Sequence, residues 1–318
     1  MSVIRVAILD DYQDVALSSA DWSPLEDLAE VTPFRRHHDG VDELTAALRD
    51  YDVVVGMRER TAFGAEVLRR LPRLRLLVTT GMANASFDLG AAAAQGVTVC
   101  GTRATGTAAP ELTWGLILAL SRQIVAEDTA LRAGHWQVTM GRGLAGATIG
   151  ILGLGRIGAR IARYAEAFEM DRIAWSPNLT PDRARECGAR AVTRRELFEQ
   201  ADIVTVHVVL SDRSRGLVGA EELAWLGADG LLVNTSRGPV VDERALVAAL
   251  HAGTIAGAAL DVYDREPLPA DDPLRGAPNT ILTPHVGYVT REGYRVFFDD
   301  VVEDILAWTA GQPVRQLA

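Results

Sequence analysis

Short apolar runs alternate with helical patterns along the whole chain. Ten of these runs read as strands: "VIRVAIL", "YDVVVG", "LRLLVTT", "VTVC", "ATIGILG", "DRIAW", "ADIVTVHVV", "GLLVNTS", "TIAGAALDV" and "NTILTP". Because nearly every position in them is apolar, they predict strands that are buried on both faces, as in parallel sheets covered by helices. The pattern predicts an α/β protein with doubly wound parallel sheets.

One of these strands leads directly into a glycine-rich turn. In "TIGILGLGRIGARIARYAEAF", Gly153, Gly155 and Gly158 form the GxGxxG pattern, and a helical apolar spacing follows them. Glycines at these positions allow a tight turn and a close approach of the backbone to a pyrophosphate, whose charge then lies at the N-terminus of the helix. The stretch therefore predicts a dinucleotide-binding site.

The chain's length and the position of this turn both predict two domains. A chain of 318 residues exceeds what one hydrophobic core usually serves. Four of the predicted strands come before the turn, which normally opens a dinucleotide-binding fold. We expect residues 1–100 to form a smaller α/β domain that is completed by a last amphipathic helix within residues 288–318. Residues 101–287 are then expected to form the NAD(P)-binding domain.

The residue that follows the next strand bears on the cofactor's phosphate. In the usual fingerprint an acidic side chain at this place binds the adenosine ribose, but "DRIAW" is followed by Ser176. A neutral serine neither binds both ribose hydroxyls strongly nor repels a 2′-phosphate. We expect NAD as the cofactor and leave NADP open.

All 32 basic residues are arginines, and this bias excludes several enzyme classes. Schiff-base and pyridoxal chemistry, the P-loop and the Tyr/Lys pair of short-chain dehydrogenases all need a lysine. The net charge of −10 disfavours nonspecific binding of nucleic acids, so an anionic substrate needs a local positive site.

Other features of the composition predict an ordinary cytoplasmic protein. No apolar run reaches about 18 residues, so no membrane span is expected, and "MSVIRVAILDD" reads as a strand and not as a signal peptide. Cys100 and Cys187 lack the spacing of metal ligands and are expected to be reduced thiols. No metal site is predicted.

Five ordered motifs carry a resemblance to a known family. They are "GATIGILGLGRIG", "ADIVTVHVVLSDRSRGLVG", "LLVNTSRGPVVDERAL", "GTIAGAALDVYDREP" and "TPHVG". Together they resemble the D-isomer-specific 2-hydroxyacid dehydrogenases, which include phosphoglycerate dehydrogenase and glyoxylate and hydroxypyruvate reductases. The resemblance implies a cofactor domain inserted into a substrate domain that is made from both chain ends.

The resemblance also implies three catalytic residues, Arg237, Glu266 and His285. The planar guanidinium of Arg237 is expected to bind the carboxylate of a small 2-keto acid or 2-hydroxy acid and to polarise its C2 carbonyl. His285 is expected to exchange the proton. Glu266, hydrogen-bonded to the imidazole, is expected to favour the charged ring and to raise its pKa.

The resemblance implies further binding residues, each at a position that matches the family's motif. Those implied for the cofactor, besides the three glycines and Ser176, are Arg156, Ile157, His207, Val208, Thr235 and Asp261. For Asp261 a cap of the strand end is the alternative. Those implied for the substrate are Arg58, Met82 and Ala83, although the family's Gly-Val-Asp run here reads Ala83, Asn84, Ala85.

Two alternatives remain for the function, and one expectation concerns assembly. A nucleotide-sensing corepressor would not need a proton donor, and formate dehydrogenases have glutamine where Glu266 stands, so both are disfavoured. The family implies a homodimer through the cofactor domains, to which "PELTWGLILALSRQ" could contribute. Trp114, Trp136 and Met140 are expected mainly in the core, with a cleft or an intersubunit contact as the alternative.

Overall fold

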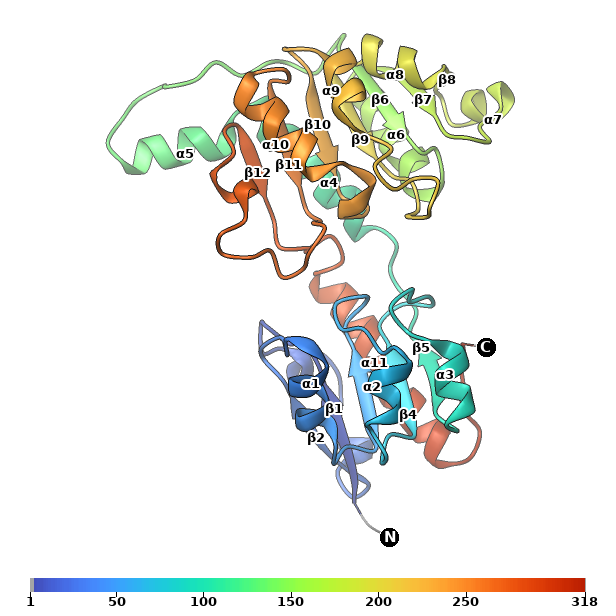
Figure 1. Cartoon of the computed structure of the whole chain (residues 1–318). Coiled ribbons are helices and arrows are strands. Elements are labelled where there is room, and N and C mark those ends of the chain that lie inside the picture. The colour runs from blue at the N-terminus through green and yellow to red at the C-terminus, as the bar shows by residue number, and fades with distance from the viewer. Residues whose placement is uncertain (1–2, 318) are drawn as a thin grey trace. The chain divides into compact units, whose positions relative to one another are not determined.

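The protein consists of two compact α/β units. The structure is a computed structural model that describes residues 3–317, and it divides into Met1–Gly106 with Val289–Ala318 (unit 1) and Thr107–Tyr288 (unit 2). Each unit contains one sheet with all strand pairs parallel (Figure 1). The predicted fold class, α/β with doubly wound parallel sheets, is confirmed.

Unit 1 has a five-stranded sheet in the order β2-β1-β3-β4-β5. The strands are β1 Ile4–Ile8, β2 Ala29–Pro33, β3 Val53–Gly56, β4 Leu76–Thr79 and β5 Thr98–Gly101. The α-helices are α1 Gly40–Leu48, α2 Ala65–Arg69, α3 Leu89–Ala94 and α11 Arg291–Thr309, and two 3-10 turns span Ala16–Ser18 and Ser23–Leu25. Helix α11 contacts β4.

Strand β2 corrects the expectation of four strands in residues 1–100, because the sheet of unit 1 has five. Its sequence "AEVTP" contains a charge and a proline, and most of its residues are only partly buried. Proline is tolerated at a sheet edge, where one side of the backbone has no partner. An edge strand of this kind does not give the continuous apolar signal that identified the others.

Unit 2 has a seven-stranded sheet in the order β12-β11-β10-β9-β6-β7-β8. The strands are β6 Thr148–Leu152, β7 Asp171–Trp175, β8 Arg190–Ala191, β9 Ile203–Val206, β10 Leu231–Asn234, β11 Gly257–Leu260 and β12 Thr280–Leu282. The α-helices are α4 Ala108–Ser121, α5 Ile124–Arg132, α6 Arg156–Ala167, α7 Pro181–Glu186, α8 Arg194–Gln200, α9 Ala220–Leu226 and α10 Glu243–Ala252. Two 3-10 turns span Gly238–Val240 and Pro273–Gly276.

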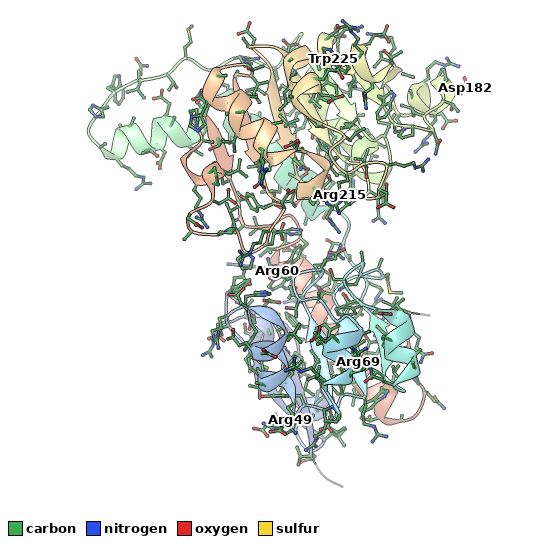
Figure 2. All side chains as sticks on the ribbon, in the orientation of Figure 1. Arg49, Arg60, Arg69, Asp182, Arg215 and Trp225 are labelled. Atoms are coloured by element: carbon green, nitrogen blue, oxygen red, sulfur yellow. The ribbon has the colours of Figure 1, made fainter. Side chains whose placement is uncertain are left out.

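Two apolar layers cover the faces of this sheet. Ile149 and Ile151 of β6 pack with Ile161 of α6 and with apolar residues of α4 in one layer. Leu152 of the same strand packs with residues of α8, α9 and α10 in the other layer. Side chains of consecutive strand residues point to opposite faces, so a strand buried in both layers must be apolar throughout. Side chains occupy the space between the helices and the sheet (Figure 2).

The sheet of unit 2 reverses its strand order between β6 and β9. In open parallel sheets, ligands bind at such a switch point, outside the carboxyl ends of the strands. The glycine turn follows β6 directly. A ligand is therefore expected at this edge of the sheet.

Several of the exposed apolar side chains lie on one part of unit 2, on α5 and the segment after it. The segment "PELTWGLILALSRQ" lies largely within α4, where Trp114, Leu116, Ile117 and Leu120 are buried in the unit's own core. Trp136 and Met140 are instead 78% and 97% exposed, which corrects the expectation of core packing. They lie in the segment after α5, and Figure 1 shows α5 and this segment standing away from the body of unit 2.

Within residues 3–317, none of the helices combines the length and the apolar character needed to cross a bilayer.

Candidate active site

The three residues predicted to be catalytic follow three neighbouring strands. Arg237 comes after β10, Glu266 after β11 and His285 after β12, and these strands are adjacent in the sheet. Neighbouring strands lie about 4.8 Å apart. Parallel strands that end at one edge therefore direct all three loops to the same side of unit 2.

The loop that carries Arg237 is organised by Asn234, the last residue of β10. Its side chain is 1% exposed, donates to Arg237 O at 3.0 Å and accepts from Ser236 N at 3.0 Å. The Nη1 atom of Arg237 donates to Ser236 O at 2.7 Å. A Cβ atom at Gly238 would overlap the backbone of Tyr263, so glycine lets the loops after β10 and β11 touch.

Glu266 and His285 meet directly. The Nδ1 atom of His285 lies 2.5 Å from Oε2 of Glu266, and both side chains are partly buried. The other carboxylate oxygen of Glu266 accepts from Tyr263 N at 3.0 Å, which fixes the orientation of the carboxylate. The ring of Tyr288 packs edge-on against the imidazole with centroids 5.7 Å apart. The pair is a carboxylate–imidazole dyad suited to proton transfer.

Asp261 holds the loop on which His285 lies. Its carboxylate is 1% exposed and accepts from Thr283 Oγ1 at 2.6 Å, Val286 N at 2.8 Å and Gly287 N at 2.8 Å. Burial raises the pKa of Asp261, and the hydrogen bond from Thr283 opposes that rise. The carboxylate thus clamps the chain on both sides of His285, whose φ of +53° is in the left-handed region.

The glycine turn has the geometry that a bound pyrophosphate requires. Gly153 has φ +104°, and a Cβ atom there would lie 2.8 Å from the backbone of His207. A Cβ atom on Gly158 would overlap Gly153 O. Gly155 has no atom within 4 Å of its Cβ position, so it faces open space at the N-terminus of α6. This combination leaves a cradle over backbone amides.

The remaining cofactor candidates lie along the same edge. Ser176 follows β7 and Thr235 follows β10, where its hydroxyl lies 2.7 Å from that of Thr113. His207 and Val208 follow β9, and His207 Nε2 lies 2.9 Å from Thr205 Oγ1. Burial lowers the pKa of His207, so its ring is neutral near pH 7. Arg156 and Ile157 begin α6.

The substrate candidates form a separate group in unit 1. Arg58 follows β3, while Met82 and Ala83 follow the neighbouring β4 and are exposed. Arg58 has φ +54°, donates through Nη1 to Thr80 O at 3.1 Å and lies against Gly81. The two loops are joined by Asn84, whose side-chain amide donates to Arg58 O at 2.6 Å.

Sequence reasoning missed Asn234, and it gave a cap of the strand end only as the alternative for Asp261, without its hydrogen bonds to the loop of His285. Both are polar residues at the end of a buried strand, a position where a buried side chain must satisfy local backbone groups. Within residues 3–317, no group of three or more His, Cys, Asp or Glu side chains is arranged to hold a metal ion. Cys100 and Cys187 are free thiols.

Fold and site together define a dinucleotide-binding α/β protein with a carboxylate–imidazole dyad at the edge of its larger sheet. Residues 114–287 match the model of the "D-isomer specific 2-hydroxyacid dehydrogenase, NAD binding domain". The chain belongs to the D-isomer-specific 2-hydroxyacid dehydrogenase family.

Named relatives agree with this assignment. The glyoxylate reductase of Korarchaeum cryptofilum is 34% identical over 272 residues, which are 83% of this chain and 82% of the relative. The D-3-phosphoglycerate dehydrogenase of Archaeoglobus fulgidus is 34% identical over 277 residues, 86% of this chain but 52% of the relative, so this chain spans about half its length. The crystal structure of phosphoglycerate oxidoreductase from Vibrio cholerae O395 is 35% identical, with a TM-score of 0.92 over 97% of this chain and 100% of that one.

Proposed function

We propose that this protein is an NAD(P)-dependent dehydrogenase that transfers a hydride between a nicotinamide and C2 of a small 2-keto acid or D-2-hydroxy acid. The observation that carries the proposal is the 2.5 Å contact between His285 Nδ1 and Glu266 Oε2. This dyad lies in the same unit as the glycine turn and at the strand ends next to Arg237.

The glycine turn supports a dinucleotide because its geometry fits one. Gly155 leaves open space above the N-terminus of α6, where Arg156 and Ile157 would lie beside the pyrophosphate. The bound nicotinamide would supply the carbon that gives or takes the hydride. Thr235 and Asp261 would lie on its side of the site, and His207 and Val208 on the adenosine side. With Ser176 at the ribose position, we propose NAD as the cofactor, with NADP accepted.

Arg237 would bind the substrate and polarise it. Its planar guanidinium can form two parallel hydrogen bonds with a carboxylate. The same group would stabilise the negative charge that gathers on the C2 oxygen as the hydride arrives. Asn234 keeps the loop in place, so that little reorganisation is needed.

His285 would donate a proton to the C2 oxygen during reduction and remove it during oxidation. Because Nδ1 contacts Glu266, Nε2 is the ring nitrogen assigned to this transfer. The carboxylate of Glu266, in contact with Nδ1, would hold the ring in the orientation that this transfer needs. Arg58 and the backbone at Met82 and Ala83 would hold the substrate from unit 1. Glyoxylate, hydroxypyruvate and 3-phosphohydroxypyruvate are the proposed substrate types.

The test is the loss of NADH or NADPH absorbance when each of these three keto acids is added. His285→Ala should lower the rate by about 10²- to 10⁴-fold, which is the usual contribution of a general acid. Binding of NADH, followed by its fluorescence, should be unchanged in this variant. Equal rates in the variant and the parent would remove the proposed proton donor.

Two alternative functions are less well supported. A nucleotide-sensing corepressor needs no proton donor, whereas this chain keeps the glutamate–histidine pair at contact distance. Formate oxidation has no proton to transfer at the substrate oxygen, and Glu266 stands where formate dehydrogenases have glutamine. Nucleotide binding without turnover of any keto acid would favour a corepressor. Reduction of NAD by formate would favour a formate dehydrogenase.

We also propose that the chain forms a homodimer through unit 2. The supporting observation is the set of exposed apolar side chains on α5 and on the segment after it, namely Ile124, Val125, Leu131, Trp136, Val138 and Met140. Extended apolar groups of this kind are uncommon on a monomer's surface and typical of interfaces. The expected contribution of "PELTWGLILALSRQ" is smaller, because its apolar residues are used in the core.

A further inference from the structure

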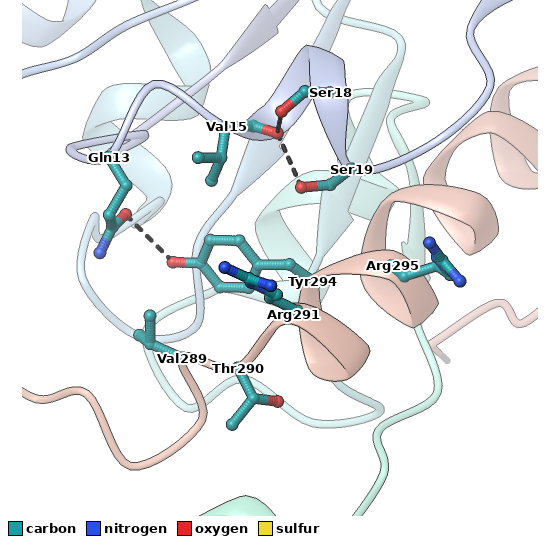
Figure 3. A pocket seen from close by; sticks show the side chains of 9 residues that line it. All are labelled: Gln13, Val15, Ser18, Ser19, Val289, Thr290, Arg291, Tyr294 and Arg295. Atoms are coloured by element: carbon teal, nitrogen blue, oxygen red, sulfur yellow. Dashed lines mark hydrogen bonds between the residues drawn. The ribbon is translucent and has the colours of Figure 1, made fainter.

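Unit 1 contains a hollow that the proposed function does not use. It has a volume of about 420 Å³ and lies between the loop after β1, residues 13–19, and the first turns of α11 (Figure 3). All its lining residues belong to unit 1. None of them is among the catalytic, cofactor or substrate candidates.

The hollow is lined by two cations and no carboxylate. Arg291 and Arg295 line it from one face of α11, and within residues 3–317 neither guanidinium makes a hydrogen bond or an ion pair. The acid within the loop, Asp14, does not line the hollow and pairs with Arg35 at 2.7 Å. The carboxylate of the buried Asp11 accepts from Val15 N at 3.0 Å and Ala16 N at 3.1 Å. The lining is therefore positively charged, although the whole chain carries −10.

The rest of the wall is polar and partly fixed. The buried Tyr294 forms its floor and donates its hydroxyl to Oε1 of Gln13 at 3.3 Å, an arrangement that leaves the amide nitrogen of Gln13 as a donor (Figure 3). Ser18 and Ser19 both donate to Val15 O, at 3.1 and 2.7 Å, so their oxygens can accept. The first backbone amides of the 19-residue α11 add partial positive charge to that provided by the arginines.

A larger hollow in unit 2 provides a comparison. It is also lined by arginines, but these have protein partners. It lies beside Thr148 and Asp171 at the amino ends of β6 and β7. Its arginines are all engaged: Arg172 pairs with Glu166 at 3.2 Å, Arg185 pairs with Asp182, and Arg190 donates to Gln200 at 2.9 Å. The hollow in unit 1 differs because its two arginines have no hydrogen-bond or ion-pair partner in the described part of the chain.

We propose that the hollow of unit 1 binds a small anionic metabolite through a carboxylate or a phosphate monoester. The anionic group would lie between the guanidinium groups of Arg291 and Arg295, with the amide of Gln13 as a further donor. A hydroxyl on the ligand would donate to the oxygens of Ser18 or Ser19. The volume is within the range of small-molecule sites, and Val15 and Val289 would contact the carbon skeleton.

The hollow shares no lining residue with the proposed substrate site, and its occupation would have a local consequence. Val289 is the first residue of unit 1 after the chain leaves unit 2. A bound anion would join the loop after β1 to the beginning of α11, directly after that crossing. Binding should therefore stabilise unit 1 against thermal unfolding, because a ligand that binds only the folded state raises its stability.

The test is calorimetric titration of inorganic phosphate, and separately of malonate, into the Arg237→Gln protein. That background removes the guanidinium proposed to bind the substrate, saturating NADH occupies the glycine turn proposed for the pyrophosphate, and the measurement needs no turnover. We expect binding at one site that weakens at least about 10-fold when Arg291→Gln and Arg295→Gln are added, with the thermal shift lost in parallel. Binding of one anion but not the other identifies which group the site takes.

Arg244→Gln is the matched control, because Arg244 is an exposed arginine in the first turn of α10 and lines neither hollow. It should leave the affinity for phosphate unchanged. An affinity in the double variant equal to that of the background protein would overturn the proposal. So would competition between phosphate and the keto acid that disappears in Arg291→Gln, since the hollow would then belong to the substrate site.

Discussion

His285 is held from several directions at once. Its ring contacts Glu266 and packs against Tyr288, its backbone nitrogen donates to Thr283 O at 3.0 Å, and Asp261 fixes the residues on both sides. A proton donor contributes most when its orientation is already that of the reaction. The contacts around His285 fix its ring in the way that the proposed role of proton donor requires.

Replacement of Glu266 by glutamine tests the role of its charge. The amide keeps the size of the side chain and can still accept from Tyr263 N, but it no longer stabilises an imidazolium. We expect kcat for keto-acid reduction to fall by about 10- to 100-fold, a part of the usual contribution of general acid catalysis, with the KM for NADH unchanged. Steady-state kinetics measures both.

Glu243→Gln is the control for this variant, because its carboxylate accepts from Asp264 N at 3.3 Å in the same part of unit 2 without contacting His285. It should retain the parent's kcat. A Glu266→Gln enzyme with full kcat would show that the carboxylate serves only to hold the loop.

The sequence predicted which residue types meet at the site but not how they are supported. Arg237, Glu266 and His285 could be predicted because each belongs to a motif that comes after one of three successive strands. Asn234 and Asp261 could not be assigned their supporting roles, because those roles depend on the paths of loops that have no periodic pattern. The roles of all these residues in catalysis stay predictions.

At the scale of elements, all ten predicted strands are present, and each was identified by a largely apolar run in the sequence. β2 and β8 were missed because β2 contains a charged residue and a proline and β8 is only two residues long. Both lie at sheet edges, where such sequences are tolerated. Asp242 caps helix α10, since its side chain accepts from Ala245 N at 3.0 Å.

The glycine turn gives a matched pair of substitutions. Gly155→Ala places a methyl group in open space, so the protein should fold with a melting temperature near that of the parent but bind NADH at least about 10-fold more weakly. Gly158→Ala forces a methyl group into Gly153 O and should destabilise the fold by about 1–3 kcal/mol. Thermal unfolding and NADH fluorescence separate the two effects. Unimpaired NADH binding by Gly155→Ala would contradict the proposed cradle.

The loop after β2 is tied to the end of β1 by an ion pair whose strength depends on pH. His37 Nδ1 lies 3.0 Å from the buried Asp10, and this hydrogen bond raises the pKa of His37. A histidine whose pKa is raised by folding contributes stability that is complete below its unfolded pKa of about 6.5 and is lost as the pH rises through the folded value.

We therefore expect the free energy of unfolding to fall as the pH is raised from about 6 to 8, in part because of His37. In His37→Gln that part of the decrease should be absent. Urea unfolding at several pH values measures it, with the exposed His135 as the control (His135→Gln). Parallel pH profiles for the parent and His37→Gln would rule out this contribution.

At the scale of the whole molecule, the exposed apolar residues around α5 lead to a prediction about assembly. Trp136→Ser combined with Met140→Ser should convert a dimer to a monomer at micromolar concentration, measured by light scattering. Val209→Ser, at a residue that is 85% exposed elsewhere in unit 2, is the control and should stay dimeric. A monomeric parent protein would refute the homodimer.

Unit 1 is assembled from two stretches of chain that residues 107–288 separate. Its fifth strand is bordered by residues near the other end of the chain, since Gly101 N donates to Arg315 O and Leu317 N donates to Val99 O. During synthesis on the ribosome, β1 to β5 therefore emerge long before α11 and these last residues can cover them. Unit 2 can be completed first, and the nascent unit 1 must wait, with part of its apolar surface unprotected, until α11 and the residues after it have been synthesised.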